Sequence, residues 1–123
     1  MPTVLVVDDD QSVRRVLRKI LERGGMTVVE ASSAHEALSV IDKDESMDAV
    51  VSDVLMPEMS GLVFYDELIA RSPRLGGRVV FLTGAAQDPA VAAPIEHRGV
   101  PLISKVDDLL LVLDAVRLAT LRR

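Results

Sequence analysis

The chain has 123 residues, 49% hydrophobic and 27% charged, so it is long enough for one domain with an apolar core and too short for a multidomain enzyme. Its formal net charge is −5, and no basic surface is predicted that could neutralise a nucleic-acid backbone. It contains no cysteine, which excludes disulfides, thiolate catalysis and cysteine-bound zinc.

Short apolar runs alternate with longer segments of helical period along the chain. Runs rich in Val and Ile predict five strands, at residues 3–7, 27–31, 49–52, 79–82 and 100–103. Apolar side chains at spacings of three and four predict five helices, at residues 12–23, 34–43, 62–71, 89–97 and 107–121. The N-terminal segment has neither a basic region nor a cleavage site of small residues, so we do not interpret it as a signal peptide. No stretch reaches the ~18 apolar residues that span a bilayer, and we expect a cytoplasmic protein that does not enter membranes.

Several element boundaries carry capping signals. Ser33 followed by Glu36 has the pattern of a capping box at the start of the second helix. Gly24 and Gly25 suit the end of the first helix, and Asp88 before Pro89 suits the start of the fourth. These local signals agree with the periodicity.

The strand pattern predicts an α/β fold. Three of the runs are continuously apolar, as in parallel strands that are buried on both faces, so helices must cover both faces of the sheet. Five strand–helix alternations predict a single-domain doubly wound (βα)5 sandwich over residues 1–123, with a flavodoxin-like parallel sheet of order 2-1-3-4-5. In such a sheet ligands bind at the carboxyl ends of the strands, where the strand order reverses.

Polar side chains follow four of the five predicted strands. Asp8 and Asp9 end the first strand, and Asp53, Thr83 and Lys105 follow the third, fourth and fifth. Each alone is more often a turn or cap residue. Together, three converging carboxylates predict a hard divalent cation, Mg²⁺ rather than Ca²⁺, because such a site leaves room for water and phosphate oxygens. A carboxylate is also a nucleophile toward a phosphoryl group, whose oxygens an ammonium and a hydroxyl would bind.

At these spacings the residues match a known family. VLVVDDD, the segment VVSDVLMPEMSG, FLTG and Lys105 resemble the receiver domain of two-component response regulators, over nearly the whole chain. The resemblance implies that Asp53 accepts a phosphoryl group from the phosphohistidine of a histidine kinase or phosphotransfer protein. It also implies that Asp9 binds Mg²⁺ directly, Asp8 mostly through water, and Leu55 through its backbone carbonyl. Asp10 stays outside this site, where it favours the positive end of the first helix.

Three departures from the family lie on the side that usually carries the output signal. Val106 follows Lys105 where the family has a cis proline, so we expect a trans bond and a differently shaped loop. Leu102 replaces the usual switch aromatic, and Pro94 interrupts the fourth helix, which we expect to be short, kinked or mobile. These departures favour a module that receives or relays phosphate, such as the receiver of a hybrid histidine kinase, over one that switches a DNA-binding domain.

Two other functions stay open. The chain could be a pseudo-receiver that acts without phosphorylation as an interaction module. Asp8 and Asp10 also fit the nucleophile and general acid of a haloacid-dehalogenase-type phosphatase, although the chain has no cap module and Asp53 would then have no role.

The last helix has two apolar stripes. One, built from Leu109, Val112, Val116 and Ala119, would face the sheet, and Leu111, Ala115 and Leu118 form the second. Neighbouring elements could cover the second stripe, or it could serve as a surface for a partner or a second copy, through Leu111 and Leu118.

Overall fold

The computed structural model describes residues 1–84, 88–105 and 109–121, and its core is a five-stranded parallel sheet. The strands are β1 (Thr3–Val7), β2 (Thr27–Ala31), β3 (Ala49–Asp53), β4 (Val79–Thr83) and β5 (Leu102–Ser104). Their order is β2-β1-β3-β4-β5, which confirms the predicted flavodoxin-like topology. The order reverses between β1 and β3, where Val7 lies level with Ser52.

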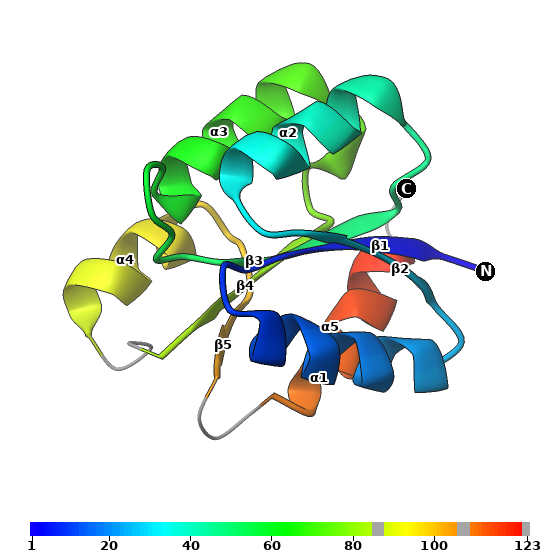
Figure 1. Ribbon diagram of the computed structural model, residues 1–123. Helices are drawn as coiled ribbons and strands as arrows, with labels where there is room; N and C mark the ends of the chain where they lie inside the picture. The colour runs from blue at the N-terminus through cyan, green and yellow to red at the C-terminus, as the bar shows by residue number, and fades with distance from the viewer. Residues whose placement is uncertain (85–87, 106–108, 122–123) are drawn as a thin grey trace.

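Helices cover both faces of the sheet, as the continuously apolar strands require. They are α1 (Gln11–Arg23), α2 (Ala34–Lys43), α3 (Gly61–Arg71), α4 (Pro89–His97) and α5 (Leu111–Thr120), with a 3-10 turn at Pro73–Leu75 that the sequence pattern did not predict. Figure 1 shows α1 and α5 on one face and α2, α3 and α4 on the other. Each face therefore has its own apolar core, and α4, with Pro94 inside it, is the short helix that was predicted.

Two element boundaries differ from their predictions by more than one residue. β5 begins at Leu102 and not at residue 100, because Pro101 has no N–H for the ladder and contributes only its carbonyl, which accepts from Phe81 N at 2.9 Å. α5 begins at Leu111 and not at residue 107. Leu109 and Leu110 form a turn, and residues 106–108 lie outside the described part of the chain.

Side-chain caps fix the helix starts. The Asp10 carboxylate accepts from the N–H groups of Ser12 and Val13, which confirms its place at the positive end of α1. Asp88 caps α4 in the same way. The Ser33 side chain caps α2 by accepting from the Glu36 N–H, as predicted. The second hydrogen bond of a capping box, from the Ser33 N–H to the Glu36 carboxylate, does not form, because Glu36 accepts from the hydroxyl of Ser32 at 2.8 Å.

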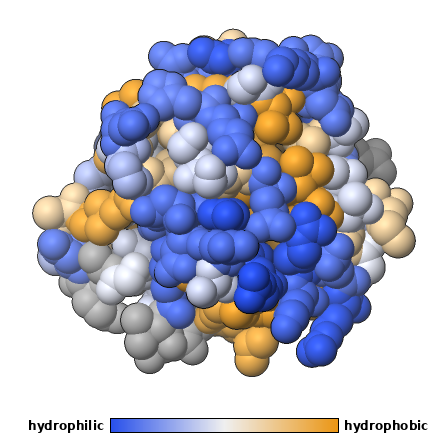
Figure 2. All heavy atoms as spheres, viewed as in Figure 1, coloured by the Kyte–Doolittle hydropathy of each residue, from blue (hydrophilic) through white to orange (hydrophobic). Residues whose placement is uncertain are grey.

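The two stripes of α5 have different environments. Val112, Val116 and Ala119 are buried against the sheet as predicted. In the second stripe Leu111 and Leu118 are 51% and 67% exposed, whereas Ala115 between them is half-buried and packs against the core. In Figure 2 the surface over α1 is mostly hydrophilic, and hydrophobic atoms show at the lower edge of the same view, where α5 begins.

In the part of the chain that the structure describes, every helix is too short or too polar to cross a membrane.

Candidate functional site

Three carboxylates meet where the strand order reverses. Asp8 and Asp9 follow β1 and Asp53 ends β3, and these strands are neighbours in the sheet. One carboxylate oxygen from each lies within 4.8 Å of those from the other two. Asp8 is fully buried, Asp53 is 6% exposed, and Asp9 lies at the surface. The cluster is thus closed toward the protein and open toward solvent on the side of Asp9.

Lys105 brings a cation into this cluster from β5. Its backbone N–H donates to the Thr83 carbonyl at 3.0 Å, which continues the β4–β5 pairing past the end of β5. Its ammonium nitrogen then lies 2.8 Å from Asp53 Oδ2, to which it donates a hydrogen bond, and 2.7 Å from Asp8 Oδ2. One lysine therefore bridges two of the three acids. The expected effect of Val106 on this loop falls outside the described residues.

The bridge leaves Asp8 incompletely satisfied. Asp8 Oδ1 accepts from the Asp10 N–H at 2.9 Å. Asp8 Oδ2 is buried, and the Lys105 ammonium contacts it as an ion pair at 2.7 Å while donating its hydrogen bond to Asp53. Among the described residues, Asp8 Oδ2 is the buried side-chain oxygen that has no other hydrogen-bond donor. A buried carboxylate oxygen that relies on a shared ion pair costs stability unless another group also binds it.

Burial and charge act in opposite directions on the site's titratable groups. Burial raises the pKa of Asp8, with a smaller contribution from the nearby charge of Asp53, even though Lys105 acts against it. Burial also disfavours the ammonium form of Lys105, but its contacts with Asp53 and Asp8 outweigh burial and raise its pKa. Lys105 is therefore a fixed positive charge, and Asp8 is a carboxylate held at some cost.

Asp53 is positioned by the loop that follows it. The Leu55 N–H donates to Asp53 Oδ1 at 3.1 Å, which holds the carboxylate toward the cluster. Gly61 packs so closely against this loop that a Cβ would lie 2.8 Å from Val54 Cα. Its N–H also donates to the Val54 carbonyl at 2.7 Å. Only a glycine allows this approach, because any side chain at position 61 would meet the backbone of Val54.

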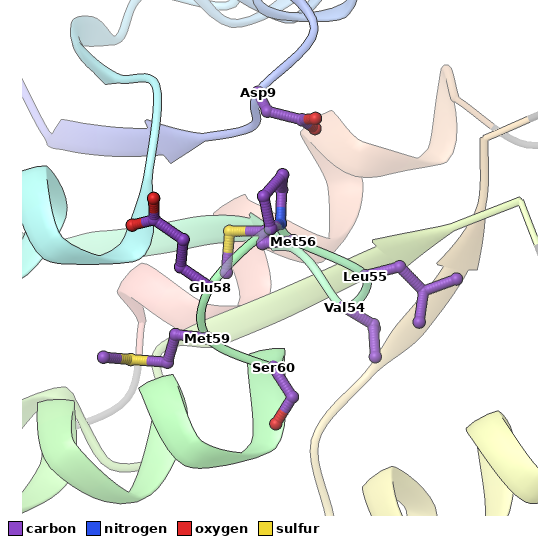
Figure 3. A pocket seen from close by; sticks show the side chains of 8 residues that line it. Asp9, Val54, Leu55, Met56, Glu58, Met59 and Ser60 are labelled. Carbon is purple, nitrogen blue, oxygen red and sulfur yellow. The ribbon is translucent and has the colours of Figure 1, made fainter.

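An open hollow of about 520 Å³ lies between Asp9 and this loop. Figure 3 shows Asp9 on one side and the loop residues, among them Leu55, Met56 and Glu58, on the other. The Leu55 side chain is 57% exposed and lies two residues after Asp53. The hollow leaves the acids accessible from solvent on this side.

Thr83 lies at the same edge of the sheet. It ends β4, is fully buried and is level with Ser104 of β5. Ala85, two residues after Thr83, lies outside the described residues. Each described residue that the sequence assigned to the site is thus found at the carboxyl edge of the sheet.

Arg14 supports the site and was missed by the sequence analysis. Its guanidinium donates to the Asp8 carbonyl at 2.6 Å and to Glu30 at 3.1 Å. It thereby fixes the backbone between Asp8 and α1. An arginine in the first turns of a surface helix gives no signal that separates it from the four other basic residues of α1.

The residues present fit a magnesium ion. All donors are oxygens, as Mg²⁺ prefers, and a buried Asp8 oxygen has no hydrogen-bond donor. Mg²⁺ holds oxygens at about 2.0–2.1 Å, so two ligands on opposite sides lie about 4 Å apart. Oxygens that already lie within 4.8 Å of one another need only a small adjustment of the exposed Asp9 side chain. Its exposure would leave other coordination positions to water and a phosphoryl group.

Comparison with known proteins agrees with this geometry. The sequence pattern of the response regulator receiver domain matches residues 4–117. The chain is 33% identical over 104 residues to the C4-dicarboxylate transport transcriptional regulatory protein DctD of Rhizobium meliloti, covering 85% of this chain and 22% of that protein. It is 40% identical over 87 residues to the sensor kinase CckA of Brucella abortus, covering 70% of this chain and 9% of that protein. The chain thus spans less than a quarter of either relative.

The fold is similar to that of a solved receiver domain. A response regulator receiver domain protein from Clostridium thermocellum superposes with a TM-score of 0.83 at 28% sequence identity, covering 99% of this chain and 96% of that one.

Proposed function

This chain belongs to the response regulator receiver domain family, and on that basis we propose that residues 1–123 form a single receiver domain whose Asp53 accepts a phosphoryl group with the help of Mg²⁺. The observation that carries the proposal is the Asp53 carboxylate, at the open edge of the sheet, 2.8 Å from the Lys105 ammonium and within a cluster of two further acids. A carboxylate so placed is a nucleophile beside the charges that a transferred phosphoryl group requires.

In the proposed reaction an oxygen of Asp53 attacks the phosphorus of a phosphohistidine. The P–N bond breaks, its electron pair stays on the imidazole nitrogen, which takes up a proton, and an acyl phosphate forms on Asp53. Lys105 already contacts Asp53 and would turn to an oxygen of the arriving group, and the Thr83 hydroxyl would donate to another. Leu55 N–H keeps the nucleophile aligned throughout.

Mg²⁺, held by Asp9 directly, by Asp8 largely through water, and by Asp53 and the Leu55 carbonyl, would neutralise the negative charge that gathers on the phosphoryl oxygens. The fit of the donor set, the unsatisfied Asp8 oxygen above all, supports this ligand assignment. Asp8 then loses the energetic penalty of its burial when the ion is bound.

The donor is a histidine kinase or a phosphotransfer protein, and the location is the cytoplasm. Relatives named as a sensor kinase and as a transcriptional regulatory protein support a place in two-component signalling. Leu102 in place of the switch aromatic and Pro94 within α4 favour the receiver of a hybrid kinase or a phosphorelay.

Labelling with a small phosphodonor tests the proposal. With Mg²⁺ and acetyl phosphate or phosphoramidate, intact-mass spectrometry should find one added phosphoryl group, and Asp53→Asn should remove it. Asp10→Asn is the matched control, because Asp10 caps α1 and lies outside the site, and it should label normally.

The alternatives predict other results. A label that survives in Asp53→Asn and disappears in Asp8→Asn would identify a haloacid-dehalogenase-type phosphatase. A chain that neither labels nor binds Mg²⁺ and beryllofluoride at Asp53 would be a pseudo-receiver.

A further inference from the structure

The exposed acid of the cluster has no support from other side chains. In the described part of the chain, the Asp9 carboxylate takes part in neither a hydrogen bond nor an ion pair, and the residue lies at the surface. Its direction is therefore set by the backbone on either side. Asp10 follows it and caps α1, and the Asp8–Asp9 peptide precedes it. Whatever holds that peptide also holds the acid that closes the cluster.

The backbone of Asp8 is bound at both of its polar groups. Its N–H donates to the Ala31 carbonyl at 3.2 Å, which continues the β1–β2 pairing past the end of β1. Its carbonyl accepts from Nη1 of Arg14 at 2.6 Å. A carbonyl and the N–H of the next residue share one rigid plane, so the arginine fixes the orientation of the peptide that leads into Asp9.

Glu30 of β2 holds the arginine in turn. Nε of Arg14 donates to Glu30 Oε1 at 3.1 Å, and Nε of Arg18 donates to Glu30 Oε2 at 2.8 Å. Burial disfavours the charged form of Glu30, but the hydrogen bonds from Arg18 and Arg14 outweigh it and lower its pKa. The Arg14 side chain is only 15% exposed. A rigid guanidinium fork thus spans a carboxylate of β2 and a carbonyl of the site.

We propose that Arg14, anchored by Glu30, is a positioning residue for magnesium, because it orients the peptide through which Asp9 enters the carboxylate cluster. The inference rests on the proposed Mg²⁺ site at Asp53. Arg14 acts through the Asp8 backbone and contacts neither the ion nor the phosphoryl group. A device of this kind tunes metal affinity through the orientation of a ligand.

The charges around the arginine suit this task. Glu30 offsets the charge of Arg14, and Arg18 has a second acid of its own, Glu22, at 3.3 Å. The group that holds the peptide is therefore close to neutral as a whole. An isolated guanidinium at the same place would repel a divalent cation from the cluster.

Positioning and charge predict opposite effects when the arginine is removed. If Arg14 acted on the ion only by repulsion, Arg14→Met would raise the Mg²⁺ affinity. If it positions Asp9, the same change frees the peptide and lowers the affinity, by about tenfold for the loss of a group that orients a metal ligand. The sign of the change in Kd therefore separates the two roles, and a loss of fold stability alone moves neither in the folded protein.

Calorimetric titration with Mg²⁺, at a temperature where each variant is folded by circular dichroism, measures this sign. Arg14→Met should raise the Kd about tenfold. Arg14→Lys keeps the charge but cannot span the carbonyl and Glu30 together, so it should remain closer to Arg14→Met than to the unmodified chain. Arg15→Met is the matched control, because it removes an exposed cation of the same helix that has no ion pair in the described structure, and its Kd should be unchanged.

Labelling of Asp53 by acetyl phosphate gives a second readout. Arg14→Met should raise the Mg²⁺ concentration that half-saturates the labelling rate by the same factor as the Kd, and saturating Mg²⁺ should restore labelling because the ion then holds Asp9. An equal or lower Kd in Arg14→Met, with Mg²⁺-dependent labelling of Asp53 in the unmodified chain, would overturn the positioning role and leave the phosphoacceptor assignment standing. An unmodified chain that binds no Mg²⁺ would overturn both.

Discussion

Replacing the buried acid of the site should make the metal-free protein more stable. In Asp8→Asn the hydrogen bond from the Asp10 N–H can remain, while the negative charge that burial disfavours is removed. Lys105 is then free to pair with Asp53 alone. We expect the free energy of unfolding in EDTA at neutral pH to rise.

The size of the gain follows from the environment of one oxygen. Asp8 Oδ2 is fully buried without a hydrogen bond, and such a group costs about 1–3 kcal/mol. Its ion pair with Lys105 recovers part of that cost, so the gain should fall toward the lower end. For a domain of this size each kcal/mol corresponds to about 3–5 °C in Tm.

Urea unfolding at several pH values measures the gain and its origin. Because the folded pKa of Asp8 is raised, the folded protein takes up its proton at a higher pH than the unfolded chain does. The unmodified protein therefore recovers stability relative to Asp8→Asn as pH falls through the folded pKa toward the ordinary value. The difference between the two proteins should be fully present at neutral pH and shrink in acid.

Asp9→Asn is the matched control, because Asp9 belongs to the same cluster but is exposed. It should leave the metal-free stability unchanged. Mg²⁺ at ten times its Kd should stabilise the unmodified protein by about 1.4 kcal/mol, and both variants should lose much of this effect, Asp9→Asn more. If Asp8→Asn is less stable than the unmodified protein in EDTA, the argument from desolvation is wrong.

Three further changes act on other parts of the site. Lys105→Met should raise the Mg²⁺ affinity severalfold in calorimetry, because it removes a cation that competes for the same carboxylates. The same change should slow the labelling of Asp53 by acetyl phosphate, and a lower Mg²⁺ affinity would refute the bridging role. Leu55→Asn, alone or with Ala85→Glu, should shorten the lifetime of the acyl phosphate as followed by intact mass. The reason is that an amide can orient a water molecule where the exposed leucine now covers the site, and an unchanged or longer lifetime would contradict it. Gly61→Ala should cost about 1–3 kcal/mol in urea unfolding, because its Cβ meets the backbone of Val54, and a neutral result would mean that the loop yields without strain.

The sheet was predictable because burial on both faces leaves a clear mark in sequence. A strand such as β1, with Val4 to Val7 almost fully inaccessible, has to be apolar at every position, and the parallel order then brings the strand ends together. That Asp8, Asp9 and Asp53 share one edge follows from this order alone. The distances could not be predicted, since they depend on side-chain directions that no periodicity encodes.

Contacts made by common surface residues could not be predicted from the sequence. Arg14 holds the Asp8 carbonyl, yet it sits in a helix with several similar cations. Glu36 accepts from Ser32 and does not complete the expected capping box, a choice between neighbouring hydroxyl and N–H groups that the sequence pattern does not encode. The start of β5 was missed because Val100 continues the apolar run although Pro101 interrupts the ladder.

The last helix shows most clearly what apolar periodicity can and cannot decide. Spacings of three and four marked two stripes and correctly assigned Val112, Val116 and Ala119 to the sheet, but left open whether neighbouring elements cover the second stripe. The sheet covers the side of Val112 and Val116, while Leu111 and Leu118 stay exposed because no described element packs over them.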